Sequence, residues 1–89
     1  MMPVYRVEYT DKALRQLERI PNPHRARIGQ KVRALADNPR PPQSCKLHGS
    51  KSLHRIRVGE YRVLYEIRDA IITVLVAHIG TRGGVYRRL

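Results

Sequence analysis

The sequence from His54 to Ile67, HRIRVGEYRVLYEI, constrains the fold more than any other stretch, because polar and apolar residues alternate on both sides of a Gly-Glu pair. Alternation with a period of two is typical of a β-strand that has one buried face. Gly59-Glu60 suits a two-residue type II′ turn, which prefers glycine at its first position. A turn of this length sets the register of both strands. The predicted cross-strand pairs are Val58 with Tyr61, Arg57 with Arg62, Ile56 with Val63 and Arg55 with Leu64.

The predicted register sorts the side chains of this hairpin onto two faces. The apolar face is expected to carry Ile56, Val58, Tyr61, Val63 and Tyr65. The opposite face is expected to carry Arg55, Arg57 and Arg62. Like charges directly opposite each other on a ladder destabilise it by up to about 1 kcal/mol. An Arg57/Arg62 pair therefore indicates a neutralising neighbour or a polyanionic ligand, and a solvated polar face is the alternative.

Proline, glycine and asparagine separate the other expected elements. These are a strand at 4–9, a helix capped by Thr10 or Asp11 and ending at Ile20, a second helix from about 23 or 24 to 37, a loop at 38–52, and strands at 53–58, 61–67 and 71–79. Apolar stripes are expected at Leu14, Leu17 and Ile20 on the first helix, and at Ile28, Val32, Leu35 and Ala36 on the second. The sequence thus predicts an α+β fold in one domain spanning residues 1–89. Its antiparallel-rich, four-stranded sheet would carry an N-terminal helical hairpin on one face.

The last hairpin is expected to turn at Asp69-Ala70, again through two residues. In this register the apolar face gains Ile72, Val74, Val76 and His78. We expect His78 to be either a buried, hydrogen-bonded histidine or a residue that assists catalysis from the strand end. The tail at 80–89, which contains Arg82, Tyr86 and Arg87, is expected to leave the other face open or half covered.

The net charge of the chain indicates which classes of partner it can bind. Its formal net charge is +11, from 18 lysines and arginines against 7 acidic residues. This excess indicates nucleic acid or an acidic protein as partner. A membrane is not expected, because no apolar run approaches the ~20 residues of a spanning helix. The charged N-terminal sequence MMPVYRVEYTD and the single cysteine, Cys45, favour a cytoplasmic protein.

The order of a strand, two helices, antiparallel strands and a basic tail resembles the RelE/ParE toxin superfamily of toxin–antitoxin systems. The sequences GEYRVLYEI and VLVAHIGTRGGVYRRL carry this resemblance, which covers nearly the whole chain. It implies one of two activities. RelE-type members are ribosome-dependent endoribonucleases that cut messenger RNA in the decoding site, whereas ParE-type members poison DNA gyrase.

The resemblance also implies particular site residues. RelE-type members have a basic-x-basic pair on the second strand, an arginine opening the third strand, an arginine after the last strand and a tyrosine in the tail. These positions are filled here by Arg55, Arg57, Arg62, Arg82 and Tyr86. The best-known member has lysines at the paired positions. Arginine stays charged where a lysine can lose its proton, so the identity of the proton acceptor is left open.

Metal-free RNA cleavage by the substrate's own 2′-hydroxyl gives each of these residues an expected role. The implied catalytic residues are Arg57, Arg62, Arg82 and Tyr86, and the implied RNA-binding residues are Arg55 and Arg87. Arg62 and Arg82 would make bidentate contacts with phosphate oxygens as charge develops on them. Arg57 would polarise or orient the 2′-hydroxyl, and Tyr86 would stack on a base or relay a proton. Arg55 would hold flanking phosphates, which contributes affinity rather than rate.

The expected partners are the ribosome with its mRNA and a cognate antitoxin whose acidic, partly disordered segment folds on contact. The free domain is expected to be a monomer and its antitoxin complex a hetero-oligomer. No cofactor or metal is expected, because Cys45, His48 and His54 lack the spacing of zinc ligands. The alternative is a ParE-like gyrase inhibitor or a non-catalytic RNA-binding module.

Overall fold

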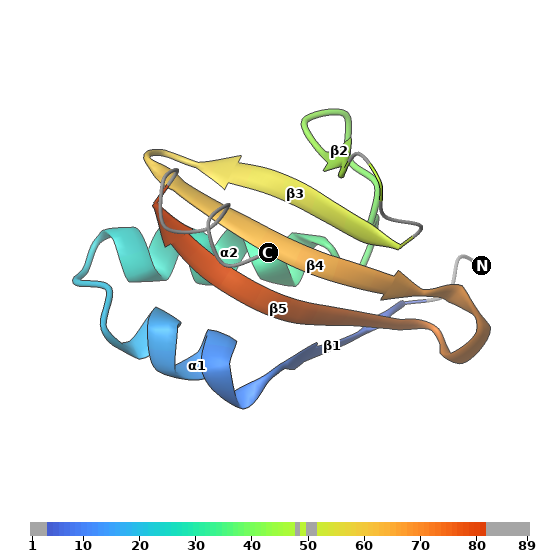
Figure 1. Cartoon of the computed structure of the whole chain (residues 1–89), viewed down its shortest axis with the longest axis horizontal. Coiled ribbons are helices and arrows are strands. Elements are labelled where there is room, and N and C mark those ends of the chain that lie inside the picture. Colours follow the sequence, from blue (N-terminus) through green and yellow to red (C-terminus); the bar gives the residue numbers. More distant parts are fainter. Residues whose placement is uncertain (1–3, 48, 50–51, 82–89) are drawn as a thin grey trace.

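The fold is a five-stranded mixed sheet with two helices on one side (Figure 1). The computed structural model describes residues 4–47, 49 and 52–81. Its elements are β1 (Arg6–Tyr9), α1 (Asp11–Glu18), α2 (His24–Ala34), β2 (Cys45–Lys46), β3 (Leu53–Val58), β4 (Tyr61–Arg68), a 3₁₀ turn (Asp69–Ile71) and β5 (Thr73–Thr81). The strand order is β1-β5-β4-β3-β2, in which β1 is parallel to β5 and the other neighbours are antiparallel.

The α+β class and the helices on one face are confirmed, but the predicted number of strands is wrong. The additional strand is β2, which pairs Cys45 with Arg55 and Lys46 with His54 at the sheet edge. It comes from the segment at 38–52 that the sequence predicts as a loop. A strand of two residues is too short to show the alternation on which the prediction depends.

The first helix begins where its capping residue predicts. The Thr10 hydroxyl oxygen accepts a hydrogen bond from the Ala13 N–H at 3.1 Å, which satisfies one of the free donors of the first turn. The second helix ends at Ala34, earlier than expected. The N–H groups of Leu35, Ala36 and Asp37 bond to carbonyls three residues back, so the chain tightens out of α-helical geometry there.

The core lies between the helices and one face of the sheet. Figure 1 shows α2 running behind the strands. The buried cluster consists of Ala13, Ile20, Ile28, Val32, Leu35, Ile56, Val58, Val63, Tyr65, Ile67, Val74, Val76 and Ile79. The predicted stripe on α1 is wrong at Leu14, which is 45% exposed, because Ala13 faces the sheet in its place.

The β3–β4 hairpin confirms the predicted register. Val58 pairs with Tyr61, Arg57 with Arg62, Ile56 with Val63 and Arg55 with Leu64. Gly59 has a φ of +61°, which is the left-handed conformation that the first position of a type II′ turn requires.

The β4–β5 turn differs from its prediction. Residues 69–71 form a 3₁₀ turn and Ile72 adopts a left-handed conformation with φ 49°, which is strained for a β-branched residue. Arg68 consequently pairs with Thr73, and Ile72 is exposed instead of lying on the apolar face. Val74 and Val76 keep their predicted places in the core.

A β-bulge in β5 also changes the face on which His78 lies. Tyr65 pairs with Val76 but Leu64 pairs with His78, so Ala77 is an extra residue between these two pairs. After the bulge, Ile79 lies on the core face and His78 on the opposite face. The prediction that His78 faces the core is therefore wrong.

A cluster of polar side chains ties the β4–β5 turn to two other segments. The Tyr5 hydroxyl donates to Asp69 at 2.6 Å, and Arg40 donates to both oxygens of the same carboxylate at 3.3 and 2.8 Å. Hydrogen bonds from Arg40 and then from Tyr5 lower the pKa of Asp69 to about 2. The same carboxylate, by accepting from the phenol, raises the pKa of Tyr5.

This cluster predicts an acid-dependent contribution to stability. A carboxyl whose pKa is lowered in the folded state stabilises the fold above its ordinary pKa of 3.8, and that contribution is lost as the pH falls toward 2. We expect Asp69→Asn to lower the free energy of unfolding at neutral pH, and the difference from wild type to shrink between about pH 4 and pH 2. Urea unfolding across this range measures it. A difference that stays constant down to pH 2 would contradict the assigned role of Asp69.

Candidate functional site: an arginine-lined sheet face

The sheet face opposite the helices, which we call the arginine face, carries the side chains of three central strands. β3 contributes Leu53, Arg55 and Arg57, β4 contributes Glu66, Leu64 and Arg62, and β5 contributes Leu75, His78 and Gly80. Leu64 is fully buried and yet lies outside the core cluster, as expected for a residue on this second face. The register places Arg57, Arg62 and Gly80 side by side in one row, and Arg55, Leu64 and His78 in the next.

Arg62 occupies the centre of the first row. The residue is only 7% exposed, and its Nε has no hydrogen-bond partner within the described part of the chain. A buried donor without an acceptor costs about 1–3 kcal/mol, and more when the group is charged. Its neighbour on β5 is Gly80, which has no side chain to accept the bond. An anionic acceptor beside Arg62 would therefore supply the hydrogen bond that its Nε lacks.

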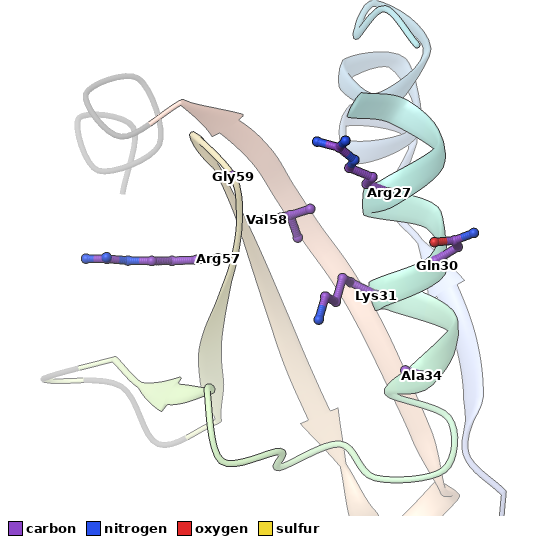
Figure 2. Close-up of a pocket in the computed structure, with 7 residues that line it drawn as sticks. All are labelled: Arg27, Gln30, Lys31, Ala34, Arg57, Val58 and Gly59. Atoms are coloured by element: carbon purple, nitrogen blue, oxygen red, sulfur yellow. The ribbon is translucent and has the colours of Figure 1, made fainter. Parts of the chain in front are cut away.

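The neighbouring arginines differ from Arg62 in exposure. Arg57, directly opposite on β3, is exposed, and Figure 2 shows its side chain pointing away from α2. Arg55 is partly buried and lies between Leu64 on β4 and Cys45 on β2. The structure thus brings together the predicted residues Arg55, Arg57 and Arg62 on one face. The other predicted residues, Arg82, Tyr86 and Arg87, lie outside the described residues.

Among the described residues of β3, β4 and β5, the carboxylate on the arginine face is Glu66, one row beyond Arg55, Leu64 and His78, and it is already paired. Glu66 accepts a hydrogen bond from Arg68 Nε at 2.6 Å, and this bond raises the pKa of Arg68. The sequence predicts that Glu66 neutralises Arg68 or Arg55, and the structure assigns it to Arg68. The charges of Arg57 and Arg62 therefore face each other with no acidic partner among the rows described above. This arrangement favours the polyanionic ligand over a neutralising neighbour as the explanation for the pair.

His78 lies beside this site in contact with the first helix. It is 4% exposed, and Gln16 of α1 places its amide nitrogen 3.4 Å from each ring nitrogen. The other end of the amide, Oε1, accepts the backbone N–H of Ile79 at 2.8 Å. Sequence reasoning missed this placement, because no local pattern marks the bulge at Ala77 that turns His78 toward the arginine face.

A groove of about 470 Å³ runs between α2 and the edge of β3 (Figure 2). It is lined by Arg27, Gln30, Lys31, Ala34, Arg57, Val58 and Gly59. The cations of α2 stand at its rim, whereas Val58 and Ala34 provide apolar surface. Arg57 is common to the groove and the arginine face, and its side chain points away from α2.

No group of three or more histidine, cysteine or acidic side chains in the described segments is arranged to hold a metal ion. Neither α1 nor α2, the helices that the structure describes, has the length and apolar character needed to cross a membrane.

The family described as "ParE toxin of type II toxin-antitoxin system, parDE" matches residues 7–86 of this chain. The chain belongs to the RelE/ParE toxin superfamily. The toxin RelE of Mycobacterium tuberculosis is 34% identical over 84 residues, which cover 93% of this chain and 87% of that protein. The predicted membership of the superfamily is thereby confirmed.

Solved structures of this superfamily share the fold. An archaeal RelE–RelB complex from Pyrococcus horikoshii OT3 contains a chain with a TM-score of 0.80 and 27% identity, covering 90% of this chain and 97% of that one. The RelBE2 toxin–antitoxin complex of Mycobacterium tuberculosis gives a TM-score of 0.80 at 27% identity, with 92% and 95% covered. Both relatives were crystallised in complex with an antitoxin.

Proposed function

We propose that this toxin is a ribosome-dependent endoribonuclease that cleaves mRNA and so inhibits translation. The observation that carries the proposal is Arg62, a nearly buried guanidinium with an unpaired Nε, set against Arg57 on a face without a free carboxylate among the described residues. A phosphate diester supplies the acceptor oxygens that this pair of arginines lacks. The relatives named RelE agree with this proposal, because the resemblance of the sequence to RelE-type members implies the same activity.

The reaction needs positioning, charge stabilisation and proton transfer. The 2′-oxygen attacks the adjacent phosphorus, the bond from phosphorus to the 5′-oxygen breaks, and a 2′,3′-cyclic phosphate and a 5′-hydroxyl result. Negative charge grows on the non-bridging oxygens during this step. We assign the stabilisation of this charge to Arg62 and the orientation of the 2′-hydroxyl to Arg57. Arg82 and Tyr86 complete the proposed catalytic set.

Binding residues have a different effect from catalytic ones. We propose that Arg55, one row away from Arg62, and Arg87 hold flanking phosphates. Such contacts are made equally before and during the reaction, so they increase affinity without increasing the rate of the chemical step. Most of this contribution is sequence-independent and sensitive to salt.

A second candidate function is inhibition of DNA gyrase, because the matching family description names ParE. In that case the arginine face would bind without moving a proton. Primer extension on translated mRNA after induction separates the two functions. Discrete cuts at ribosome-occupied codons are expected for the nuclease. Intact mRNA together with trapped gyrase–DNA complexes would contradict the nuclease function and support the ParE-like function.

We also propose that a cognate antitoxin with an acidic, partly disordered segment holds the toxin inactive. The groove beside α2 offers cations from Arg27 and Lys31 next to apolar surface, which suits an amphipathic acidic segment. In the cleavage assay, addition of the antitoxin should stop the cutting of ribosome-bound mRNA. Undiminished cutting at saturating antitoxin would contradict this partner.

A further inference from the structure

The backbone conformation of Gly80 does not explain why glycine occupies this position of β5. Glycine is disfavoured within a strand, because it has no side chain to pack and loses much conformational freedom on folding. Glycine is needed where φ is positive, but among the described glycines only Gly49 and Gly59 have such a φ. The backbone at position 80 is therefore compatible with other residues. A glycine within a strand often marks a place that a ligand approaches closely.

The ladder between β4 and β5 determines what lies next to Gly80. The Ile79 N–H points away from β4, because it donates to Gln16 Oε1 at 2.8 Å. Inward and outward groups alternate along an antiparallel strand, so the N–H and C=O of Gly80 point toward its partner Arg62. The Cα atoms of such a hydrogen-bonded pair lie about 5.5 Å apart. A side chain at position 80 would thus lie on the arginine face, directly beside that of Arg62.

The side chains next to Arg62 in this row do not accept its Nε hydrogen. Arg57, on the other side of Arg62, carries only donors, and Gly80 has no side chain. Leu64, two residues along β4 on the same face, is apolar. These neighbours agree with an Nε that has no partner within the described part of the chain, in a residue that is only 7% exposed. Position 80 is where a side chain could supply the missing acceptor, and glycine supplies none.

We propose that Gly80 is a positioning residue of the nuclease, because it keeps Arg62 unpaired within the protein until a non-bridging oxygen of the scissile phosphate accepts the Nε hydrogen bond. This inference rests on the proposed nuclease function. An acceptor at position 80 would pair with Arg62 before the RNA binds. The guanidinium would then stabilise the developing negative charge less than an unpaired one does.

Gly80→Asp tests this arrangement without RNA, and Gly80→Asn is its matched control of equal size. Arg57 and Arg62 face position 80 from β3 and β4, and His78 lies two residues away on β5. The new carboxylate should therefore have a pKa below its ordinary value of about 3.9, and stabilise the fold above that pH. We expect urea unfolding to show Gly80→Asp more stable than Gly80→Asn near pH 6, and the difference to disappear toward about pH 3.

The same substitution should slow the chemical step. We expect single-turnover cleavage on programmed ribosomes to be about 10²-fold slower in Gly80→Asp than in wild type, as after loss of a preorganised donor. Thr81→Asp is the matched control for the added charge, because Thr81 is exposed and pairs with Tyr61 on the opposite face of the sheet. It should keep the wild-type rate.

A smaller pair of variants gives the answer if aspartate at this position prevents folding. Gly80→Ser adds a hydroxyl that can accept from Nε, whereas Gly80→Ala adds only a methyl group. Gly80→Ser should therefore cut more slowly than Gly80→Ala. Equal rates in these two variants would mean that the acceptor is irrelevant, and would overturn the role assigned to Gly80.

A double variant distinguishes this role from a local distortion of β5. In the Arg62→Ala background, Gly80→Asp should lower the rate little further, because both substitutions remove the same donor from the reaction. A distortion of the strand would instead lower the rate in both backgrounds. Losses that multiply would thus contradict a role of Gly80 through Arg62.

The outcomes separate this inference from the nuclease function. If Gly80→Asp is no more stable than Gly80→Asn near pH 6, the inference is overturned, and the nuclease function still stands where the wild type cuts ribosome-bound mRNA. If the wild type leaves this mRNA intact, the nuclease function fails and the positioning role of Gly80 fails with it. The stability difference then shows separately whether position 80 lies beside the unpaired Arg62.

Discussion

Arg62→Ala should lower the single-turnover rate of mRNA cleavage on programmed ribosomes by about 10²-fold or more, because it removes a preorganised donor from the developing charge. Arg62 is already buried and its Nε has no partner among the described residues. The group therefore does not have to be reorganised when the negative charge develops. Binding of the toxin to the ribosome should change far less than the rate.

Three variants test whether the lower rate reflects a slower chemical step and not weaker binding. Arg62→Lys keeps the charge but loses the bidentate geometry, so its rate should fall between those of wild type and Arg62→Ala. Arg15→Ala, an exposed arginine of α1, should leave the rate unchanged. Arg55→Ala should weaken binding with a nearly intact rate. If Arg62→Ala cuts within a few-fold of wild type while toxicity persists, the arginine face is not a catalytic site.

Local chemistry predicts the part of the site that lies on β3 and β4. Gly59 and the alternation around it fix the register, and the register places Arg57 opposite Arg62. A two-residue turn has few conformations, and a one-residue slip would move the whole apolar set to the wrong face. The sequence therefore contained enough information to bring these two arginines together.

The same reasoning fails on β5 because the determining features are not local. The turn at 69–72 is held by Tyr5 and Arg40, which are distant in sequence, and it places Ile72 in a conformation that its own propensity disfavours. The bulge at Ala77 coincides with the end of β1 pairing, where Thr10 and Gln16 take over the strand edge. Tertiary contacts thus placed His78 on the arginine face, and no pattern within β5 could indicate it.

The helices stabilise the sheet that carries this site by packing on its other face, and Ile28→Ala should show by how much. Ile28 of α2 is 0% exposed and lies in the core cluster. Truncation of a fully buried isoleucine to alanine costs about 2–5 kcal/mol, since the lost burial and the remaining cavity both contribute. A small domain has a total stability of about 5–15 kcal/mol, so this single change removes a large fraction of it.

Urea unfolding of Ile28→Ala and of the control Leu14→Ala measures how much each substitution lowers the free energy of unfolding. Leu14 is 45% exposed, so its truncation should cost no more than about 0.5 kcal/mol. The two substitutions remove similar side chains, and burial is what distinguishes them. The folded fraction of Ile28→Ala should still cut mRNA at nearly the wild-type rate, because Ile28 lies on the helix side of the sheet, away from Arg62. An equal loss of stability in both variants would mean that α1 and α2 do not pack on the sheet as the structure places them.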